Sequence, residues 1–187
     1  KNIKLINFPD IDFLVLIKYI FQKYLIYSII KIMNKLIVQK KPLWNIYVKN
    51  LSSNFIISDK NILKDSKKIR STNNHEWADP FIFKFKNKEY IFFENNDLEI
   101  NRGKISCGLL DKNKLTNVKD ILNFKHHLSY PFILKKNKDI FLIPESSANK
   151  SLTIWKSVKF PYKWKFYKTL FKNEYCCDTT IILEDTN

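Results

Sequence analysis

The N-terminal part of the chain carries apolar residues at helical spacing. From about Asp10 to Gln39 there is no internal Gly or Pro, and Pro9 with Asp10 supplies a start signal. The apolar side chains cover most of a helix circumference: Phe13, Leu14, Ile17, Ile20, Phe21, Tyr24, Leu25, Ile29, Ile32, Met33 and Leu36. This pattern predicts one long helix over residues 10–39.

Lysines interrupt the apolar surface of this predicted helix. A membrane-spanning helix needs about 20 largely uncharged residues. Four lysines break every window of that length: Lys18, Lys23, Lys31 and Lys35. We therefore predict that residues 1–41 are a helical linker or the tail of a preceding domain. The alternative is that helix 10–39 lies on a membrane surface as a basic amphipathic helix. We favour the linker, which Lys40-Lys41-Pro42 would end.

From Pro42 onward the pattern changes to short β-branched and aromatic runs that are typical of strands. Two hairpin-like stretches are near copies of each other, namely 78–83 with 89–94 and 129–134 with 139–145. Pro80 and Pro131 are 51 residues apart, and Glu94 and Glu145 have the same spacing. A third copy begins at 178–183. The equal spacing disfavours a chance likeness between two ordinary hairpins.

Further strand-like runs follow each copy, at 104–107 and 119–122 and then at 152–155 and 164–167, and an earlier unit leaves one run at 44–48. Four antiparallel strands in about 50 residues are the signature of a β-propeller blade. A propeller closes with about 4–8 blades. We therefore predict an all-β fold over residues 42–187, an incomplete β-propeller with about two full blades and parts of two more, preceded by an α-helix. The chain is expected to be a piece of a longer protein.

Antiparallel pairing brings the start of the first strand of each copy against the end of the second. Asp79 is expected opposite Glu94, and Tyr130 opposite Glu145, with turns near Lys86-Asn87 and Asn137-Lys138. Asp178 takes the position of Asp79 in the third copy. In a propeller these positions meet at one channel mouth, which gathers a set of polar and aromatic side chains: Trp77, Asp79, Glu94, His126, His127, Ser129, Tyr130, Glu145, Ser146 and Asp178.

Carboxylates set among aromatic rings suit sugar recognition, because rings stack on sugars while carboxylates accept hydrogen bonds from hydroxyls. The predicted substrate-binding residues are Trp77, Glu94, His127, Ser129, Tyr130 and Ser146. Glycoside hydrolysis needs an acid and a base or nucleophile, and the candidates for these roles are Asp79, Glu145 and Asp178. Asp79 is equally a candidate turn residue before Pro80, and the two glutamates are candidate solvated strand ends. His126-His127 lacks a third ligand, so neither a metal nor a cofactor is predicted.

Composition narrows the function classes. The net charge is +15, but only Arg70 and Arg102 are arginines, so the bidentate donors that read bases and phosphates are scarce and nucleic-acid binding is disfavoured. We take the lysines as solvated surface. With 2 glycines in all, no glycine-rich phosphate loop is available. The 3 cysteines form no CxxC pair, which favours a reduced, cytoplasmic location.

Five motifs carry a resemblance to a known family: 44–47, 77–81, 127–132, 143–147 and 178–180. Together they resemble the N-terminal domain of glucosamine inositolphosphorylceramide transferase and its bacterial relatives, within the five-bladed propeller superfamily of arabinanase- and xylosidase-type glycosidases. The resemblance covers about residues 42–187 and implies a five-bladed propeller. It also implies a companion catalytic domain upstream, of sugar formyltransferase-like or glycosyltransferase type. Asp79 matches the glycosidase base, whereas Tyr130 stands where those enzymes have an Asp before Pro, which argues against hydrolysis.

The leading functional prediction is a carbohydrate-active propeller module that binds a glycan or a substrate derived from a nucleotide sugar within a larger glycan-modifying transferase. The first alternative is an active glycoside hydrolase or glycosyl transferase that uses the channel carboxylates as acid and base. The second alternative is a protein-interaction propeller, in which the acidic mouth is incidental.

Overall fold

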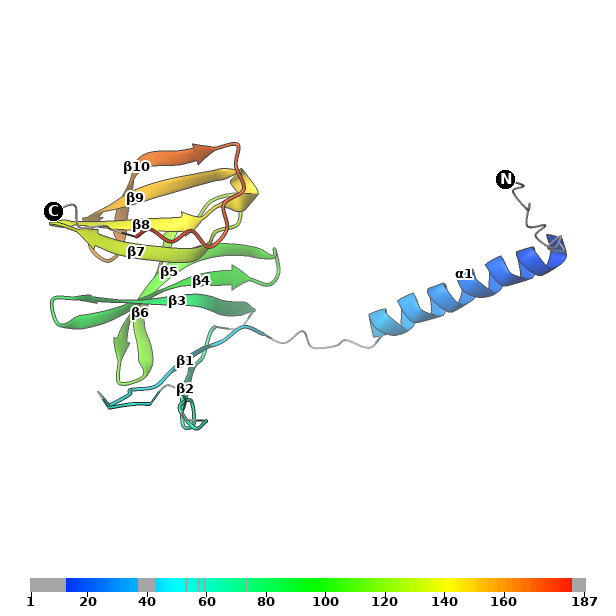
Figure 1. The fold of residues 1–187 in the computed structure, drawn as a ribbon, viewed down its shortest axis with the longest axis horizontal. Helices are drawn as coiled ribbons and strands as arrows, with labels where there is room; N and C mark the ends of the chain where they lie inside the picture. The colour runs from blue at the N-terminus through cyan, green and yellow to red at the C-terminus, as the bar shows by residue number, and fades with distance from the viewer. Residues whose placement is uncertain are drawn as a thin grey trace, which may run out of the picture. The chain divides into compact units, whose positions relative to one another are not determined.

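The computed structural model describes residues 13–36, 43–52, 54–56, 58, 60–72 and 74–182 (Figure 1). The chain divides into two compact units, Lys1–Pro42 and Leu43–Asn187. Each unit is described by itself.

The first unit contains helix α1, Phe13–Leu36. The predicted helix is confirmed over these 24 residues, and its predicted ends at 10–12 and 37–39 lie outside the described residues. The side chains from Leu14 to Ile29 are all exposed. In the described part of the chain, no helix has the length and apolarity required to cross a membrane.

In its described residues the second unit is all-β apart from one 3₁₀ turn, η1, at Ser147–Asn149. Its strands are β1 Ile46–Val48, β2 Lys67–Ile69, β3 His75–Phe85, β4 Lys88–Asp97, β5 Arg102–Asp111, β6 Lys114–Leu122, β7 Ser129–Lys136, β8 Asp139–Glu145, β9 Ser151–Lys159 and β10 Lys163–Lys172. Every strand predicted between residues 44 and 167 is present, and both predicted hairpin turns lie where expected, with Lys86, Asn87 and Asn137 at positive φ.

The strands form two four-stranded antiparallel sheets, in the orders β3-β4-β5-β6 and β10-β9-β8-β7, and β1 pairs with β2 in a small third sheet. Each four-stranded sheet is a meander of consecutive strands (Figure 1). The third copy differs from its prediction, because residues 178–182 form no strand. The rest of that copy lies outside the described residues.

Both faces of the first sheet are buried at its central strand β4. Ile91, Phe92 and Phe93 follow one another on β4, with exposed fractions of 1%, 0% and 0%. Successive side chains of a strand point to opposite faces. Phe92 accordingly joins the core shared with the second sheet, while Ile91 and Phe93 join a separate core with β1 and β2. This explains why β4 is a continuous apolar run rather than an alternating one.

The core between the two large sheets, which we call the inter-sheet core, comprises Phe92, Ile105, Cys107, Leu122, Leu128, Ile133, Ile140 and Leu142. Phe160, in the turn between β9 and β10, packs against four aromatic rings of the first sheet at centroid distances of 4.6–5.9 Å. The second sheet is therefore held to the first by aromatic packing as well as by aliphatic contact.

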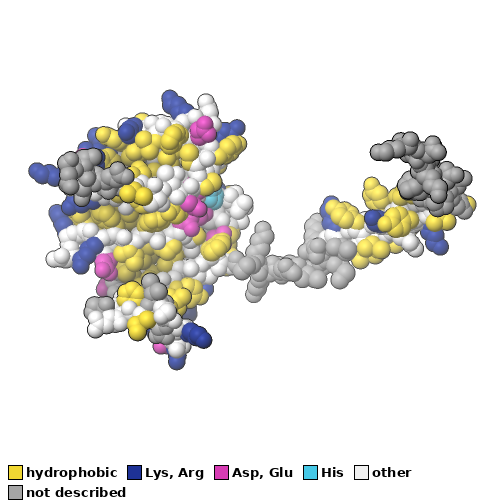
Figure 2. Space-filling model, in the orientation of Figure 1, with side chains coloured by type: hydrophobic (Ala, Val, Ile, Leu, Met, Phe, Trp, Pro, Cys, Tyr) yellow, Lys and Arg dark blue, Asp and Glu magenta, His cyan; other side chains and the backbone are white. Residues whose placement is uncertain are grey.

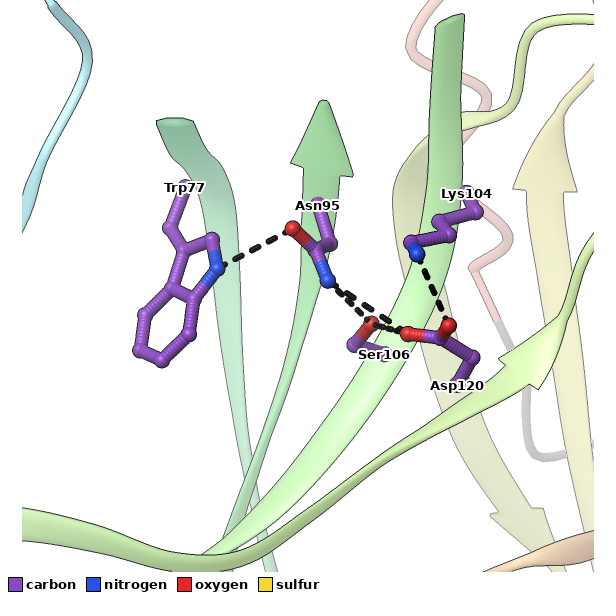
Figure 3. A network of polar contacts seen from close by, with 5 residues as sticks. All are labelled: Trp77, Asn95, Lys104, Ser106 and Asp120. Carbon is purple, nitrogen blue, oxygen red and sulfur yellow. Dashed lines mark hydrogen bonds and ion pairs between the residues drawn. The ribbon is translucent and has the colours of Figure 1, made fainter. Parts of the chain in front are cut away.

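On the side facing β1 and β2, a polar network crosses all four strands of the first sheet (Figure 3). The Trp77 indole donates to Asn95 Oδ1 at 3.1 Å, and the Asn95 amide donates to Ser106 Oγ at 3.1 Å. Ser106 Oγ donates to Asp120 Oδ1 at 2.7 Å, and Lys104 Nζ lies 2.8 Å from Asp120 Oδ2. Asp120 is therefore the acceptor on which the network ends.

Burial raises the pKa of Asp120, but hydrogen bonds from Lys104, Ser106 and Asn95 outweigh it and leave the pKa below its ordinary value. A lowered pKa means that the folded state prefers the charged form. The network therefore stabilises the fold above the ordinary Asp pKa of about 3.9. This contribution is lost as the pH falls through the lowered value in the folded state.

We predict that Asp120→Ala lowers the free energy of unfolding by about 1 kcal/mol at neutral pH, because Ser106 and Asn95 lose their acceptor. The difference from the unsubstituted chain should shrink as the pH falls below about 4. Urea unfolding across this pH range measures both effects. Asp111→Ala is the matched control, since Asp111 is exposed. An equal loss in both variants, or a difference independent of pH, would contradict the prediction.

Candidate functional site

The first strands of the two four-stranded sheets, β3 and β7, are edge strands and are interrupted at equivalent places. The register shifts between Ala78 and Phe81 on β3 and between Ser129 and Phe132 on β7. Asp79 and Tyr130 sit in these bulges with positive φ of 49° and 41°. A proline follows each of them, and proline has no N–H to donate to the ladder. The X-Pro dipeptide of each repeat therefore marks a bulge.

The bulge changes the pairing predicted for Asp79 and Tyr130. The body of each hairpin keeps the predicted register, as in Phe81 opposite Phe92. Beyond the bulge, Glu94 lies opposite Ala78 instead of Asp79, and Glu145 lies opposite Ser129 instead of Tyr130. The predicted partners are thus wrong by one residue, because a bulge sets two residues against one.

The same bulge moves Trp77 away from the mouth. An inserted residue switches the face to which the preceding side chains point. Phe81 packs on the inter-sheet core, whereas Trp77 is 5% exposed, packs 4.6 Å from Phe93 and belongs to the core with β1 and β2. Its indole N–H is used by Asn95. In this structure Trp77 is a core residue rather than a platform for sugar stacking.

Three polar contacts link successive repeats near the bulges. The Tyr130 backbone amide donates to Asp79 Oδ2 at 3.2 Å, and the Asp178 amide donates to Glu145 Oε2 at 3.0 Å. His127 Nε2 lies 3.1 Å from Glu94 Oε1. Acidic side chains lie next to a histidine on the face shown in Figure 2. The first repeat thus contacts the second through Asp79 and Glu94, and the second contacts the third through Glu145.

We call Asp79, Glu94, Glu145, His127 and Tyr130 the carboxylate cluster. The hydrogen bond that His127 donates to Glu94 raises the pKa of His127 above its ordinary value despite partial burial, and the charges of Glu94, Glu145 and Asp79 add to this effect. All three carboxylates therefore act on one imidazole. The His127 side chain is 39% exposed and that of Glu94 is 12% exposed, so a partly accessible imidazole lies beside a shielded carboxylate.

Tyr130 extends the cluster toward the third repeat. Its ring packs edge-on against Phe81 with centroids 4.9 Å apart, and its hydroxyl lies 3.0 Å from Thr180 Oγ1. Phe81 and Tyr130 are both half-buried. They are therefore the aromatic surface that the structure places beside the carboxylates.

Four further residues of the predicted site lie outside the carboxylate cluster, namely Ser129, His126, Ser146 and Asp178. Ser146 is 2% exposed, and its hydroxyl donates to the Ser151 carbonyl. Ser129 is half-buried in the β7–β8 ladder, and the Asp178 side chain is exposed. His126 stacks on Phe124 at 5.3 Å, outside the cluster. Among the described residues, no group of three or more His, Cys, Asp or Glu side chains is placed to hold a metal ion.

Gly103 is a site residue that sequence reasoning missed. Its amide donates to His127 Nδ1 at 2.9 Å, and its carbonyl accepts from the Leu128 amide at 2.9 Å. A Cβ at this position would lie 2.5 Å from the Leu128 carbonyl oxygen and 2.8 Å from Glu94 Oε1. Gly103 is one of only 2 glycines in the chain, and that scarcity was the available signal.

Comparison with known proteins identifies the family. Residues 27–187 match the family described as "Glucosamine inositolphosphorylceramide transferase 1, N-terminal". The chain belongs to this family. The predicted resemblance is thereby confirmed, and every residue of the carboxylate cluster lies inside the matched range.

Individual relatives in this family are much longer than the chain. Glucosamine inositolphosphorylceramide transferase 1 of Arabidopsis thaliana is 33% identical over 107 residues, which are 56% of this chain and 14% of that protein. The protein of the same name from Oryza sativa subsp. indica is 33% identical over 95 residues, or 50% of this chain and 13% of that protein. The crystal structure of α-L-arabinofuranosidase from Lactobacillus brevis is similar with a TM-score of 0.47 and 16% identity, over 58% of this chain and 40% of that one.

The first prediction for the carboxylate cluster concerns the protonation of His127. Its Nδ1 accepts from Gly103, so protonation places two donors face to face and breaks that bond. We expect NMR titration to give His127 a pKa above the ordinary value of about 6.5, with the Gly103 amide resonance following the same midpoint. The stabilisation from the charged pair is complete below that ordinary value and is lost as the pH rises through the raised one.

Glu94→Gln should move the His127 midpoint downward, because the substitution removes the charge that holds the proton. His126 serves as an internal control, since burial lowers its pKa. A His127 midpoint at or below that of His126, or one unchanged by Glu94→Gln, would refute this description of the pair.

The second prediction concerns Gly103→Ala. The added methyl group collides with a backbone carbonyl that cannot rotate away, so the His127-Leu128 segment must shift. We expect a loss of stability of about 1–3 kcal/mol and loss of the raised His127 pKa. Gly108→Ala is the matched control, because its nearest contacts are side-chain carbons at 3.0–3.4 Å. Thermal unfolding and the His127 titration measure the two effects, and a larger effect at Gly108 would be the contrary result.

Proposed function

We propose that this chain is part of a carbohydrate-binding β-propeller that recognises a saccharide within a larger glycan-modifying transferase. The carboxylate cluster is the proposed binding site. The single observation that carries the proposal is the contact of Glu94 with His127 of the next repeat at 3.1 Å, on an imidazole that also feels the negative charges of Asp79 and Glu145.

The propeller architecture is proposed from the repeat. Two consecutive four-stranded meanders pack against each other, with β3 and β7 as equivalent strands that carry the same bulge. The contacts from Asp79 to Tyr130 and from Glu145 to Asp178 repeat from one unit to the next. A ring of such units is a propeller. We propose five blades from the resemblance to the five-bladed glycosidase superfamily.

Sugar recognition suits the chemistry of the cluster. Saccharides offer hydroxyl donors to fixed carboxylates and apolar ring faces to aromatic side chains. Asp79 and Glu145 provide acceptors held in place by backbone amides, and the contact with His127 holds the carboxylate of Glu94. Phe81 and Tyr130 provide an aromatic surface next to them. The relatives are named for glucosamine transfer, so glucosamine-containing glycans are the first candidates.

Binding fits the contacts better than hydrolysis. Acid–base catalysis with Asp79, Glu145 and Asp178 requires groups that are free to exchange protons with the substrate. Asp79 and Glu145 instead each use an oxygen to hold the backbone of the following repeat. These contacts suit fixed acceptors for sugar hydroxyls.

The test is glycan binding by the Asp79→Asn, Glu145→Gln double variant. Both amides keep an oxygen that can accept the same backbone N–H, so the fold should survive while the negative charges are removed. On a printed array that includes glucosamine-terminated glycans, the chain should bind a defined subset. The double variant should weaken this binding about tenfold, as expected for two charged hydrogen bonds.

The matched control is Glu89→Gln, Asp111→Asn. Glu89 is exposed at the other end of β4 from Glu94, and Asp111 is exposed at the end of β5. This control should bind as the unsubstituted chain does. Absence of glycan binding, or an equal loss in both double variants, would reject the saccharide site.

A further inference from the structure

A second concentration of charge lies away from the carboxylate cluster. Strand β2 and the turn between β5 and β6 line a hollow of about 610 Å³, within the range of about 300–1,000 Å³ for small-molecule pockets. Its lining residues are Lys67, Lys68, Ile69, Arg70, Lys112, Asn113, Lys114 and Leu115. We call it the cationic hollow. It shares no residue with the carboxylate cluster.

The charges of the cationic hollow are all of one sign. Five of its eight lining residues are Lys or Arg, and none is Asp or Glu. Among the described residues, none of these five side chains takes part in an ion pair. All five are exposed. Like charges that face one hollow repel one another unless an anion joins them.

One of the five cations is an arginine. The chain has 33 Lys and Arg residues in all, of which only Arg70 and Arg102 are arginines. A guanidinium presents its N–H groups as a planar fork that matches two phosphate oxygens, whereas an ammonium is a point charge. Arg70 therefore gives the hollow a donor suited to phosphate, and the lysines surround it with charge.

The backbone fixes the two sides of the hollow. Ile69 is 4% exposed and packs in the same core as Trp77 and Phe93, with Leu115 packed against that core. Across the hollow, Lys112 and Asn113 have positive φ of 45° and 68°, which is the geometry of a tight two-residue hairpin turn. Ile69 and Leu115 thus anchor the two sides of the hollow in one core.

We propose that the cationic hollow binds the phosphate group of a phosphate ester, with Arg70 as the bidentate donor and Lys68 and Lys112 as flanking cations. Leu115, which is half-buried, offers an apolar contact to the part of the ester next to the phosphate. The phosphate can belong to a soluble sugar phosphate or to a lipid headgroup, and the chemistry of recognition is the same. This inference is independent of saccharide binding at the carboxylate cluster.

The test compares two triple variants of the full chain. The hollow variant is Lys68→Gln, Arg70→Gln, Lys112→Gln, and the charge-matched control is Lys135→Gln, Lys138→Gln, Lys163→Gln. The six side chains are all exposed, so neither variant should disturb the core, which thermal unfolding verifies. Both variants lose the same net charge. Only a local site distinguishes them.

Two probes separate the sources of phosphate. Calorimetry with glucose 6-phosphate, against glucose, tests a soluble ester. Cosedimentation with phosphatidylcholine vesicles, with and without phosphatidic acid, tests a lipid headgroup. In at least one arm we expect phosphate-dependent binding that falls about tenfold in the hollow variant and stays within about twofold in the control. Arg70→Lys should fall severalfold, because it keeps the charge and loses the fork.

The arm that responds identifies the source of the phosphate. Absence of binding in both arms, or an equal loss in both triple variants, would overturn the proposal. Binding of duplex DNA that needs the same cations, with neither phosphate probe bound, would overturn it in favour of a nucleic-acid site.

Discussion

Phe92, Ile105 and Leu142 are completely buried between the two four-stranded sheets, and their packing sets the position of one sheet against the other. Loss of one such side chain typically costs about 3–5 kcal/mol for Phe and 2–5 for Leu or Ile. A hydrogen bond such as that from Tyr130 to Asp79 contributes about 1 kcal/mol. The apolar core therefore fixes the spacing of the repeats, and the polar contacts at the mouth form because the core has already placed them within reach.

Much of this organisation can be predicted from the residues. The 51-residue spacing and the runs of β-branched and aromatic residues determine strands, turns and repeat boundaries, because these depend on local pattern. The X-Pro dipeptides also indicate a break in the ladder. Which pairing follows the break cannot be inferred from pattern alone, since one inserted residue changes every partner beyond it. The position of Trp77 was predicted wrongly for that reason.

The role of Gly103 is a second feature that the sequence pattern does not predict. Its importance comes from Leu128 and Glu94, which are distant in sequence and approach it only after the two repeats pack.

The placement of charge in space is a third feature that the sequence pattern does not predict. The net charge of +15 is a sum, and a sum does not reveal that carboxylates gather around His127 or that five cations line one hollow. Composition alone predicts that the lysines form solvated surface, and it does not reveal which of them line one hollow.

The contacts between repeats also bear on how such a site is built. Asp79 and Glu94 belong to the first repeat, but their partners Tyr130 and His127 belong to the second, and Glu145 of the second repeat contacts the third. No single sheet holds a complete set of donors and acceptors. Residues that join the repeats are then the same residues that would meet a ligand, so binding and assembly are coupled at each carboxylate. A change that removes the charge but keeps the accepting oxygen separates these two roles, whereas a change that removes the oxygen would disturb both.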